Sequence, residues 1–301
     1  MSSISVIIPT YNCAQWLERA VQSVLSQGFQ ELEVIIVDDG STDATAKMVK
    51  PWVASGAVKY IFQQNRGLPA SRNAGARVAT GEYLAFLDAD DALAPGALRQ
   101  MSEAMDQSGA SWCLIDIVRV ADSASEVQQT VVPEDDPFYG ILAYNFVRRG
   151  MFFRSSGFFD AGMYDEAIRM CEDWELNIRM FEQRRSHVYV PEPLYLYTKR
   201  EGSITTGRVA ENLAYTEKVF RKHHKRLADA GDKRAAQLYG AHMWDIARKY
   251  RYSVHLPIAA TRCMRESLVY DFNWSRLLHP IGHMAGKAFH RVRGEAVKQA
   301  G

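Results

Sequence analysis

The sequence has few cysteines and no long hydrophobic run, and each shortage excludes a class of protein. The four cysteines lie far apart and form no Cys-x-x-Cys pair, so we expect neither a zinc knuckle nor a disulfide framework. A reducing compartment suits such a chain best. A membrane-spanning helix needs about 18 consecutive apolar residues, and no such run occurs. The N-terminus has no basic segment ahead of its short apolar run, so we also expect no signal peptide.

Length and composition are those of an ordinary globular protein. The chain has 301 residues, which suggests about two domains. It is 47% hydrophobic and 24% charged, which excludes a disordered or collagen-like protein. The net charge of +1 hides an asymmetry, because residues 1–207 carry 18 basic and 27 acidic side chains and residues 208–301 carry 18 basic and 8 acidic ones. The two parts, at −9 and +10, should therefore face different partners.

The hydrophobic pattern changes along the chain and indicates three regions. Over the first 120 residues, short β-branched runs alternate with helix-period segments, which is typical of βαβ units. We expect strands at Ser5–Ile8, Glu33–Val37, Val58–Phe62, Tyr83–Leu87 and Ser111–Val120, and helices at Ala14–Ser26, Asp43–Ala54, Leu68–Val78 and Gly96–Gln107. Residues 121–160 resemble a loop-rich crossover. A helix from Glu172 and strands at Val188–Val190 and Leu194–Thr198 follow, and after Gly207 only helices are expected, near 208–229, 233–251, 257–270 and 281–299.

These regions predict an α/β fold with two domains. A doubly wound, mostly parallel, Rossmann-like sheet would occupy residues 1–207, with a first half at 1–120 and a second half at 121–207. A basic, all-helical extension would occupy residues 208–301.

Carboxylates follow three of the expected elements. Val37 leads into Asp38-Asp39-Gly-Ser-Thr-Asp43, Leu87 leads into Asp88-Ala-Asp90-Asp91, and Glu172-Asp173 opens a helix. Ligands of open α/β sheets bind beyond the carboxyl ends of the strands, where the first two clusters lie. The first cluster also fits a simple turn and helix cap.

The second acidic cluster is harder to explain without a ligand. Two unit charges about 4 Å apart interact by roughly 4 kcal/mol at an effective dielectric of about 20, so three crowded carboxylates repel strongly. A divalent cation would remove that repulsion, since Mg²⁺ takes carboxylate, phosphate and water oxygens. Asp88 and Asp90, two apart on an extended segment, can reach one site. A solvated capping loop is the alternative.

Five motifs in order resemble the family 2 glycosyltransferases, over about residues 3–205. They are Val6-Ile-Ile-Pro-Thr-Tyr-Asn12, Val37-Asp-Asp-Gly-Ser-Thr-Asp43, Asn65-Arg-Gly-Leu-Pro-Ala-Ser-Arg-Asn-Ala-Gly75, Leu87-Asp-Ala-Asp-Asp91 and Glu172-Asp-Trp174. The resemblance implies a GT-A fold that holds a nucleoside-diphosphate sugar, with a nucleotide-binding half at 1–120 and an acceptor half at 121–207. It also implies a bacterial enzyme of cell-surface polysaccharide or lipopolysaccharide synthesis.

The resemblance assigns roles to individual residues around the donor. Pro9, Thr10 and Tyr11 would line the nucleotide pocket, and Asp39 would accept a hydrogen bond from the base, commonly uracil. Asp88 would lie near the ribose. Asp90 would bind the Mg²⁺ or Mn²⁺ that bridges the two phosphates. Arg72 would belong to a stretch that closes over the nucleotide, although an exposed arginine at a helix start is the plain alternative.

The same resemblance implies that Asp173 is the general base. At a helix N-terminus its carboxylate is favoured by about 0.3–1 kcal/mol, which keeps it ready to accept a proton. Glu172 is the alternative base, or it orients the acceptor. A base opposite the leaving group implies direct displacement with inversion, and nothing in the sequence marks a covalent nucleophile.

One segment departs from the family pattern. Many relatives carry Tyr-Arg-x-His-x-x-Ser, and this chain has Tyr197-Thr-Lys-Arg-Glu-Gly-Ser203, with Arg200 in place of the histidine. An arginine cannot bind a cation, but its guanidinium can grip a diphosphate. Arg200 is therefore either a nucleotide-binding residue that stabilises the leaving group or an ordinary surface arginine.

The C-terminal segment has an apolar stripe with basic side chains around it. The stripe holds Ile281, Met284, Ala285, Ala288, Phe289 and Val292. Such a helix either lies on the inner face of an anionic cytoplasmic membrane, where lipid-linked acceptors occur, or packs on the catalytic domain. No nucleic-acid-binding motif accompanies the basic charge.

We therefore expect a cytoplasmic enzyme that moves a sugar from a nucleoside-diphosphate donor, which the resemblance implies to be UDP-linked, to a glycan or lipid-linked acceptor. A nucleotidyltransferase is one alternative, although Pro9-Thr-Tyr-Asn12 is not the Gly-rich phosphate loop it would need. A nucleotide-sugar-binding protein without catalysis is the other. The sequence identifies neither the sugar, nor the acceptor, nor the oligomeric state.

Overall fold

The computed structural model describes residues 2–121, 124–147, 149–199 and 208–271, which form two compact units. The first unit comprises residues 1–219 and the second residues 220–301. The expected boundary at 207/208 falls beside residues outside the described part. Helix α10 (Val209–Phe220) belongs mostly to the first unit, because Lys218 Nζ donates to the carbonyl of Ala167 at 2.6 Å and Thr216 contacts Cys171.

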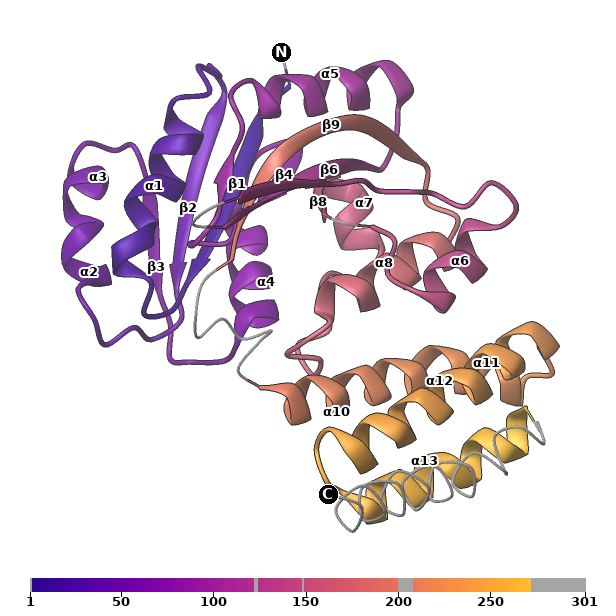
Figure 1. Cartoon of the computed structure of the whole chain (residues 1–301). Coiled ribbons are helices and arrows are strands. Elements are labelled where there is room, and N and C mark those ends of the chain that lie inside the picture. The colour runs from indigo at the N-terminus through magenta and orange to yellow at the C-terminus, as the bar shows by residue number, and fades with distance from the viewer. Residues whose placement is uncertain (1, 122–123, 148, 200–207, 272–301) are drawn as a thin grey trace, which may run out of the picture. The chain divides into compact units, whose positions relative to one another are not determined.

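The first half of the sheet is parallel, as the alternating pattern predicts (Figure 1). Its strand order is β3-β2-β1-β4. The strands are β1 (Ile4–Thr10), β2 (Leu32–Asp38), β3 (Lys59–Phe62) and β4 (Tyr83–Phe86), and the helices between them are α1 (Ala14–Leu25), α2 (Thr45–Met48), α3 (Lys50–Ala54) and α4 (Leu68–Val78). The single helix expected over 43–54 is in fact two, because Pro51 starts a new helix and supplies no backbone N–H to the preceding one.

The strand order reverses between β1 and β4. The chain runs outward from β1 to β2 and β3, then crosses back to β4 on the other side of β1. Right-handed crossovers therefore place α1 and α4 on opposite faces, as Figure 1 shows. Such a reversal opens a crevice at the carboxyl ends of β1 and β4, which is where ligands bind in sheets of this kind. Thr10 ends β1, and Asp88 follows β4.

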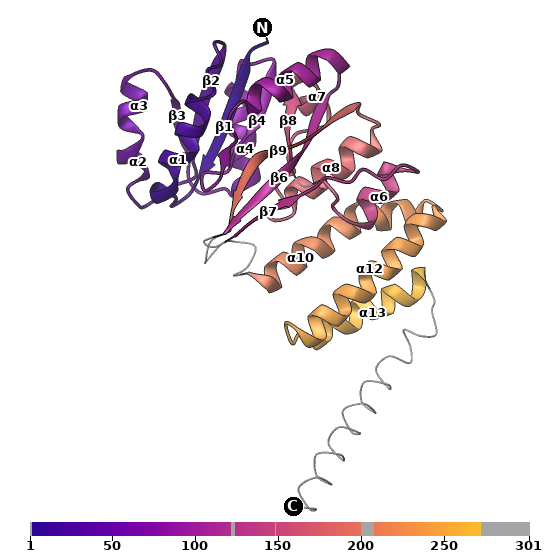
Figure 2. The ribbon, with the colours of Figure 1, turned by 45° about the horizontal axis from the view of Figure 1, so that its top comes forward.

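The second half of the sheet is mixed, and it holds strands that the pattern does not predict. The order continues from β4 through β8, β6 and β9 to β5, and β7 pairs with β6 (Figure 2). The strands are β5 (Ala92–Leu93), β6 (Trp112–Ala121), β7 (Ala124–Gln128), β8 (Arg149–Arg154) and β9 (His187–Thr198). Strand β8 is antiparallel to both β4 and β6, so the interpretation of 121–160 as crossover was incomplete. The two strands expected within 188–198 are one, whose register against β6 shifts near Asp116.

Helices and aromatic rings fill the space beside this half. The helices are α5 (Ala97–Ser108), α6 (Pro137–Ala143), α7 (Ser155–Asp160) and α8 (Glu172–Glu182). Phe86 of β4 contacts Phe153 of β8, Phe158 of α7 and Tyr164, with ring centroids 5.1–6.0 Å apart. This buried aromatic cluster joins β4 to the segment that leads into α8.

The second unit is helical wherever it is described, as expected. It contains η1 (Arg221–Lys225), α11 (Arg226–Asp229), α12 (Lys233–Tyr252) and α13 (Pro257–Tyr270). Inside it, the carboxylate of Glu266 binds Arg221 and the hydroxyl of Tyr239. The amphipathic segment predicted at 281–299 lies outside the described residues. Within the described ranges, no helix is both long enough and apolar enough to cross a bilayer.

Helix α4 lies very close to the sheet because of one glycine. A Cβ atom at Gly75 would lie 2.4 Å from Cγ2 of Ile7 and 3.1 Å from Cγ2 of Val37. Both contacts are to buried strand residues that have little room to move. Only glycine allows this approach, which sets the height of α4 above β1 and β2.

We expect Gly75→Ala to lower the free energy of unfolding by about 1–3 kcal/mol, because the added methyl group overpacks this contact. Chemical denaturation measures the change. Val78→Ala is the matched control, since Val78 lies on the same helix and is 47% exposed, and it should change stability by no more than about 0.5 kcal/mol. Equal effects of the two substitutions would contradict the close approach.

Candidate active site

The loops after β1 and β2 are bound to each other. Asn12 has a left-handed φ of 52°, and its Oδ1 accepts a hydrogen bond from the Thr42 N–H at 2.8 Å. Its own N–H donates to Ser41 Oγ at 2.9 Å. Asp43 Oδ2 accepts from the N–H of Ala14, the first residue of α1, at 3.0 Å. The acidic residue after one strand therefore caps the helix that follows the other.

The three aspartates at and after the end of β2 have different hydrogen-bonding partners. Asp38 is fully buried and accepts from the Ser41 N–H and the Tyr60 hydroxyl, both at 2.7 Å. Asp38 and Asp43 thus fit the turn-and-cap interpretation. Asp39 instead points to another loop, as the next contacts show.

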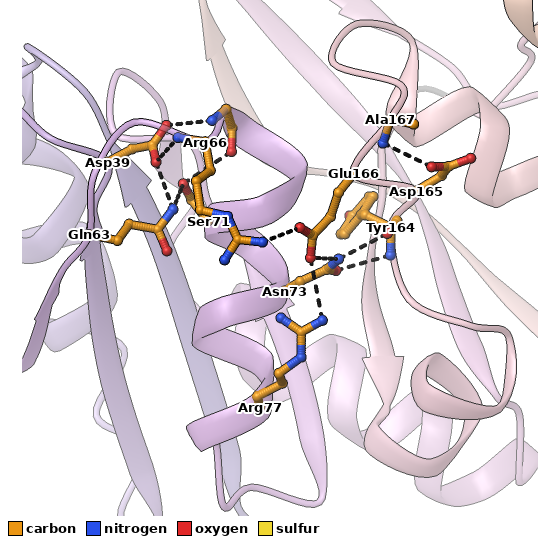
Figure 3. Close-up of polar contacts among 11 residues, drawn as sticks. Asp39, Gln63, Arg66, Ser71, Asn73, Arg77, Tyr164, Asp165, Glu166 and Ala167 are labelled. Atoms are coloured by element: carbon orange, nitrogen blue, oxygen red, sulfur yellow. Dashed lines mark hydrogen bonds and ion pairs between the residues drawn. The ribbon is translucent and has the colours of Figure 1, made fainter.

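Asp39 organises the loop that precedes α4 (Figure 3). Its Oδ1 accepts from Gln63 Nε2 at 2.6 Å and from the Arg66 N–H at 2.9 Å, and its Oδ2 accepts from the Gly67 N–H at 2.8 Å. The residue is 4% exposed. Three donors within the chain already fix the carboxylate, so any ligand at Asp39 would share it with this loop.

Pro9, Thr10 and Tyr11 lie at the end of β1, as predicted for residues of the crevice. Pro9 and Thr10 are buried, and Tyr11 is 49% exposed. The Oγ1 atom of Thr10 is buried and has no hydrogen-bond partner among the described residues. Because a buried hydroxyl is normally hydrogen-bonded, this atom is a candidate contact for a bound ligand.

Two carboxylates of the acidic cluster after β4, those of Asp91 and Asp88, are held by separate partners. Asp91 is 1% exposed and accepts from the Tyr195 hydroxyl at 2.7 Å and the Thr198 N–H at 2.8 Å, so it attaches the cluster to β9. Asp88 Oδ1 accepts from Arg72 Nη2 at 2.6 Å. Asp90 is half-buried, and its carbonyl accepts from Arg19 Nη2 at 2.6 Å.

Arg72 joins this cluster to the start of α8. Its side chain is 1% exposed, and its Nη1 donates to Glu172 Oε1 at 2.7 Å while Nη2 holds Asp88. The carbon of the guanidinium lies 5.1 Å from the centroid of the Tyr164 ring. The alternative prediction, that Arg72 is an exposed arginine at a helix start, is therefore wrong. Arg72 contacts two of the predicted site residues directly.

Glu172 and Asp173 lie in the first turn of α8 and differ in environment. Glu172 is buried, and burial raises its pKa to about 6 although the positive charge of Arg72 works in the opposite direction. Asp173 is half-buried, and its Oδ1 accepts from the Trp174 N–H at 2.7 Å. The ion pair of Glu172 fixes this turn, and the carboxylate beside it is partly accessible.

The donors after β4 fit a hard cation that binds together with phosphates. Among the described residues, no three His, Cys, Asp or Glu side chains gather into a group that could hold a metal ion. Mg²⁺ needs only one or two protein carboxylates when phosphate and water supply the other oxygens. Asp90, with Asp88, offers that donor set. Arg200 lies outside the described residues.

Sequence reasoning missed several residues that hold the site together. Tyr195 binds Asp91, and its hydroxyl also accepts from the Asp88 N–H at 3.2 Å. Asn73 binds the segment before α8 at the Tyr164 carbonyl and at Glu166. Asn73 lies inside the quoted Asn65–Gly75 motif, which was a usable signal, whereas nothing in the local sequence of Tyr195 or Glu166 indicates their partners.

Comparisons with known proteins identify relatives of this chain. The family profile described as "Glycosyl transferase family 2" matches residues 5–160. The chain is 26% identical to "Uncharacterized glycosyltransferase EpsJ" of Bacillus subtilis, over 75% of this chain and 69% of that protein. It is 30% identical to "Succinoglycan biosynthesis protein ExoO" of Rhizobium meliloti, over 67% of this chain and 62% of that protein. The chain thus spans somewhat less than two thirds of ExoO.

Solved structures of similar fold include two with bound nucleotide sugars. TarS of S. aureus in complex with UDP-GlcNAc has a TM-score of 0.63 at 18% identity, and the match covers 93% of this chain and 92% of that one. Mannosyltransferase PcManGT from Pyrobaculum calidifontis, in complex with GDP-Man and Mn²⁺, has a TM-score of 0.61 at 17% identity, covering 99% and 84%. At such identities the likeness shows a shared fold.

The raised pKa of Glu172 predicts a pH dependence of stability. Between its ordinary pKa of 4.5 and about 6, the folded protein binds a proton that the unfolded chain has lost, so stability falls as pH rises through this window. The difference in unfolding free energy between wild type and Glu172→Gln should therefore decrease by on the order of 2 kcal/mol from pH 4.5 to 7.

Urea denaturation of both proteins at several pH values measures this difference. Glu172→Gln keeps the size of the side chain and an oxygen that accepts from Arg72. The substitution therefore removes the titrating group and leaves the packing of the site in place. A difference that stays constant, or that grows as pH rises, would show that the ion pair with Arg72 outweighs burial.

Proposed function

The chain belongs to glycosyl transferase family 2 and is a glycosyltransferase with the GT-A fold expected from its sequence. We propose that it moves a sugar from a nucleoside diphosphate to a hydroxyl group, with inversion at the anomeric carbon. One observation carries this proposal. The guanidinium of Arg72 holds Asp88, on the proposed donor side, and Glu172, on the proposed base side, so both groups border one crevice.

The donor side is proposed at the ends of β1, β2 and β4. Pro9, Thr10 and Tyr11 would border the nucleotide, with the buried Thr10 hydroxyl as a hydrogen-bonding group. Asp39 would accept from the base, and uracil is the first base to test, since TarS was solved with UDP-GlcNAc. Asp88 would contact the ribose. Arg72 would act on the nucleotide through Asp88, because both of its terminal nitrogens bind carboxylates.

Asp90, with Asp88, would hold Mg²⁺ or Mn²⁺ together with the diphosphate. Such an ion neutralises charge on a departing diphosphate, and a neighbour of similar fold, PcManGT, was solved with Mn²⁺. The two carboxylates supply the hard oxygen donors that these ions prefer. Arg200 remains a predicted contact of the same diphosphate.

The proposed reaction is a direct displacement at the anomeric carbon. Asp173 takes the proton as the O–H bond of the acceptor breaks, and the acceptor oxygen forms the new bond to carbon. The bond from carbon to the phosphate oxygen breaks at the same time, and the nucleoside diphosphate leaves with the electron pair. Attack from the face opposite the leaving group inverts the configuration. Arg72 holds Glu172, and this pair would keep the neighbouring Asp173 in position to act as the base.

The acceptor is proposed to be a glycan or a lipid-linked sugar of a cell-surface polysaccharide or lipopolysaccharide. The relative ExoO is named a succinoglycan biosynthesis protein, which supports this class of acceptor. A cytoplasmic location remains a prediction. A peripheral contact with the membrane through residues 281–299 also remains a prediction, since those residues lie outside the described part.

We expect Asp173→Asn to bind donor within about threefold of wild type and to lower donor turnover by about 10²–10⁴-fold, because an amide cannot accept the proton. A panel of UDP- and GDP-sugars with Mn²⁺, screened by thermal shift, first identifies the donor, since a ligand of the native state raises the melting temperature. Turnover, including transfer to water, is then measured on that donor.

Glu172→Gln is the comparison that separates the two acidic residues. Full loss in that variant with turnover retained in Asp173→Asn would assign the base to Glu172. If no nucleotide sugar of the panel binds or turns over, the proposed donor class is wrong.

For Asp90→Ala we expect turnover to lose its dependence on added Mn²⁺ and to fall to the level of wild type in excess chelator, because the cation would lose one of its two proposed protein carboxylates. Titration of Mn²⁺ against both proteins, with the donor from the panel, measures this. Full wild-type activity in chelator would remove the cation from the proposal.

A further inference from the structure

The proposed base depends on a segment that has no regular structure of its own. Residues 164–171 form the last part of the connection from α7 to α8 and contain no helix or strand, and the first turn of α8 follows with Glu172 and Asp173. A base must stay within hydrogen-bonding distance of its substrate, so something must fix this segment. Helix α10 contacts the segment at Ala167 and Cys171, and helix α4 supplies buried contacts through two adjacent residues, Arg72 and Asn73.

Asn73 binds both the backbone carbonyl and the backbone N–H of Tyr164 (Figure 3). Its Nδ2 donates to the Tyr164 carbonyl at 2.9 Å, and its Oδ1 accepts from the Tyr164 N–H at 3.0 Å. Asn73 is 1% exposed, and both bonds are buried. Only an amide offers a donor and an acceptor here, since aspartate has no donor and alanine has neither.

The same amide also binds Glu166, two residues further along the segment. Asn73 Nδ2 also donates to Glu166 Oε1 at 3.1 Å, and Glu166 Oε2 accepts from Arg66 Nη2 at 2.7 Å. The backbone N–H of Arg66 is one of the three donors to Asp39. The ion pair of Arg66 is half-exposed and contributes little by itself, so at this end of the segment the buried amide bonds of Asn73 are the stronger contacts.

Arg72, the preceding residue, fixes the other end of the segment. It binds Glu172, and its guanidinium lies over the ring of Tyr164, whose backbone Asn73 holds. The segment is therefore attached to α4 at its start by a neutral pair of hydrogen bonds and at its end by a buried ion pair. Neither Arg72 nor Asn73 has to contact the sugar to affect where Asp173 lies.

We propose that Asn73 is a positioning residue, which sets the location of the proposed base by holding Tyr164 to α4. The inference rests on the proposed function of Asp173. The side chain of Asn73 hydrogen-bonds to Tyr164 and Glu166, neither of which is a predicted donor residue, so its loss should affect the rate of the chemical step and leave donor binding unchanged. A misplacement of about 1 Å can cost about 10²-fold in rate.

Hydrogen exchange on the unliganded protein is the first test, because it needs no substrate. In Asn73→Ala we expect amides of residues 164–173 to exchange at least about tenfold faster than in wild type, since two buried hydrogen bonds to the segment are lost. The matched control is Asn177→Ala, which removes another buried amide of the same unit whose Nδ2 donates to Asn145 at 3.3 Å. Its exchange over 164–173 should equal that of wild type.

Kinetics on the donor identified by the panel is the second test. We expect Asn73→Ala to lower kcat at least about tenfold below Asn177→Ala, with the donor KM within about threefold of wild type. Asn73→Asp keeps the bond from the Tyr164 N–H and loses both donations from Nδ2, so it gives the same readout if Asn73→Ala does not fold.

The outcomes separate the inference from the proposed function. Equal exchange over 164–173 in the two alanine variants, or a raised donor KM with kcat retained, would overturn the role of Asn73. If wild type turns over no nucleotide sugar, the proposed function fails, and the exchange experiment still decides whether Asn73 holds the segment.

Discussion

One buried positive charge determines how the two halves of the sheet domain meet. Arg72 is almost fully enclosed, and a buried charge without a partner is very costly, so its guanidinium must face carboxylates. It faces one at the end of β4 and one at the start of α8. Breaking either pair would leave a charge uncompensated, which is why the distance between these two elements can vary little. Arg72 therefore fixes the spacing between the end of β4 and the start of α8.

The other groups around the crevice are held by bonds between loops. Asn12 and Asp43 join the loops after β1 and β2, Asp39 arranges the loop before α4, and Tyr195 fastens the acidic turn after β4 to β9. Each motif supplies a partner for another motif. Such mutual support orients polar groups before a ligand arrives, and this kind of preorganisation is what stabilises developing charge in an active site.

Local patterns in the sequence predicted the parallel half of the sheet and all of its strands. They worked there because β1 to β4 alternate with helices, and β1, β2 and β3 each pair with the strand next to them in sequence. Strand β8 was missed, since its partners β4 and β6 lie far away in sequence. The acidic motifs of the site were found from their position after strands. The partners of those carboxylates, such as Tyr195 and Glu166, depend on tertiary packing that no local pattern encodes.

The insertion of β8 beside β4 has a consequence for synthesis on the ribosome. Strand β4 pairs with β1 on one edge at once, but its other edge stays open until Arg149–Arg154 has emerged. All four residues of β4 are buried in the finished protein, so the nascent chain carries an unprotected, apolar sheet edge during that interval. Chaperones that shield such edges would matter most for this stretch of translation.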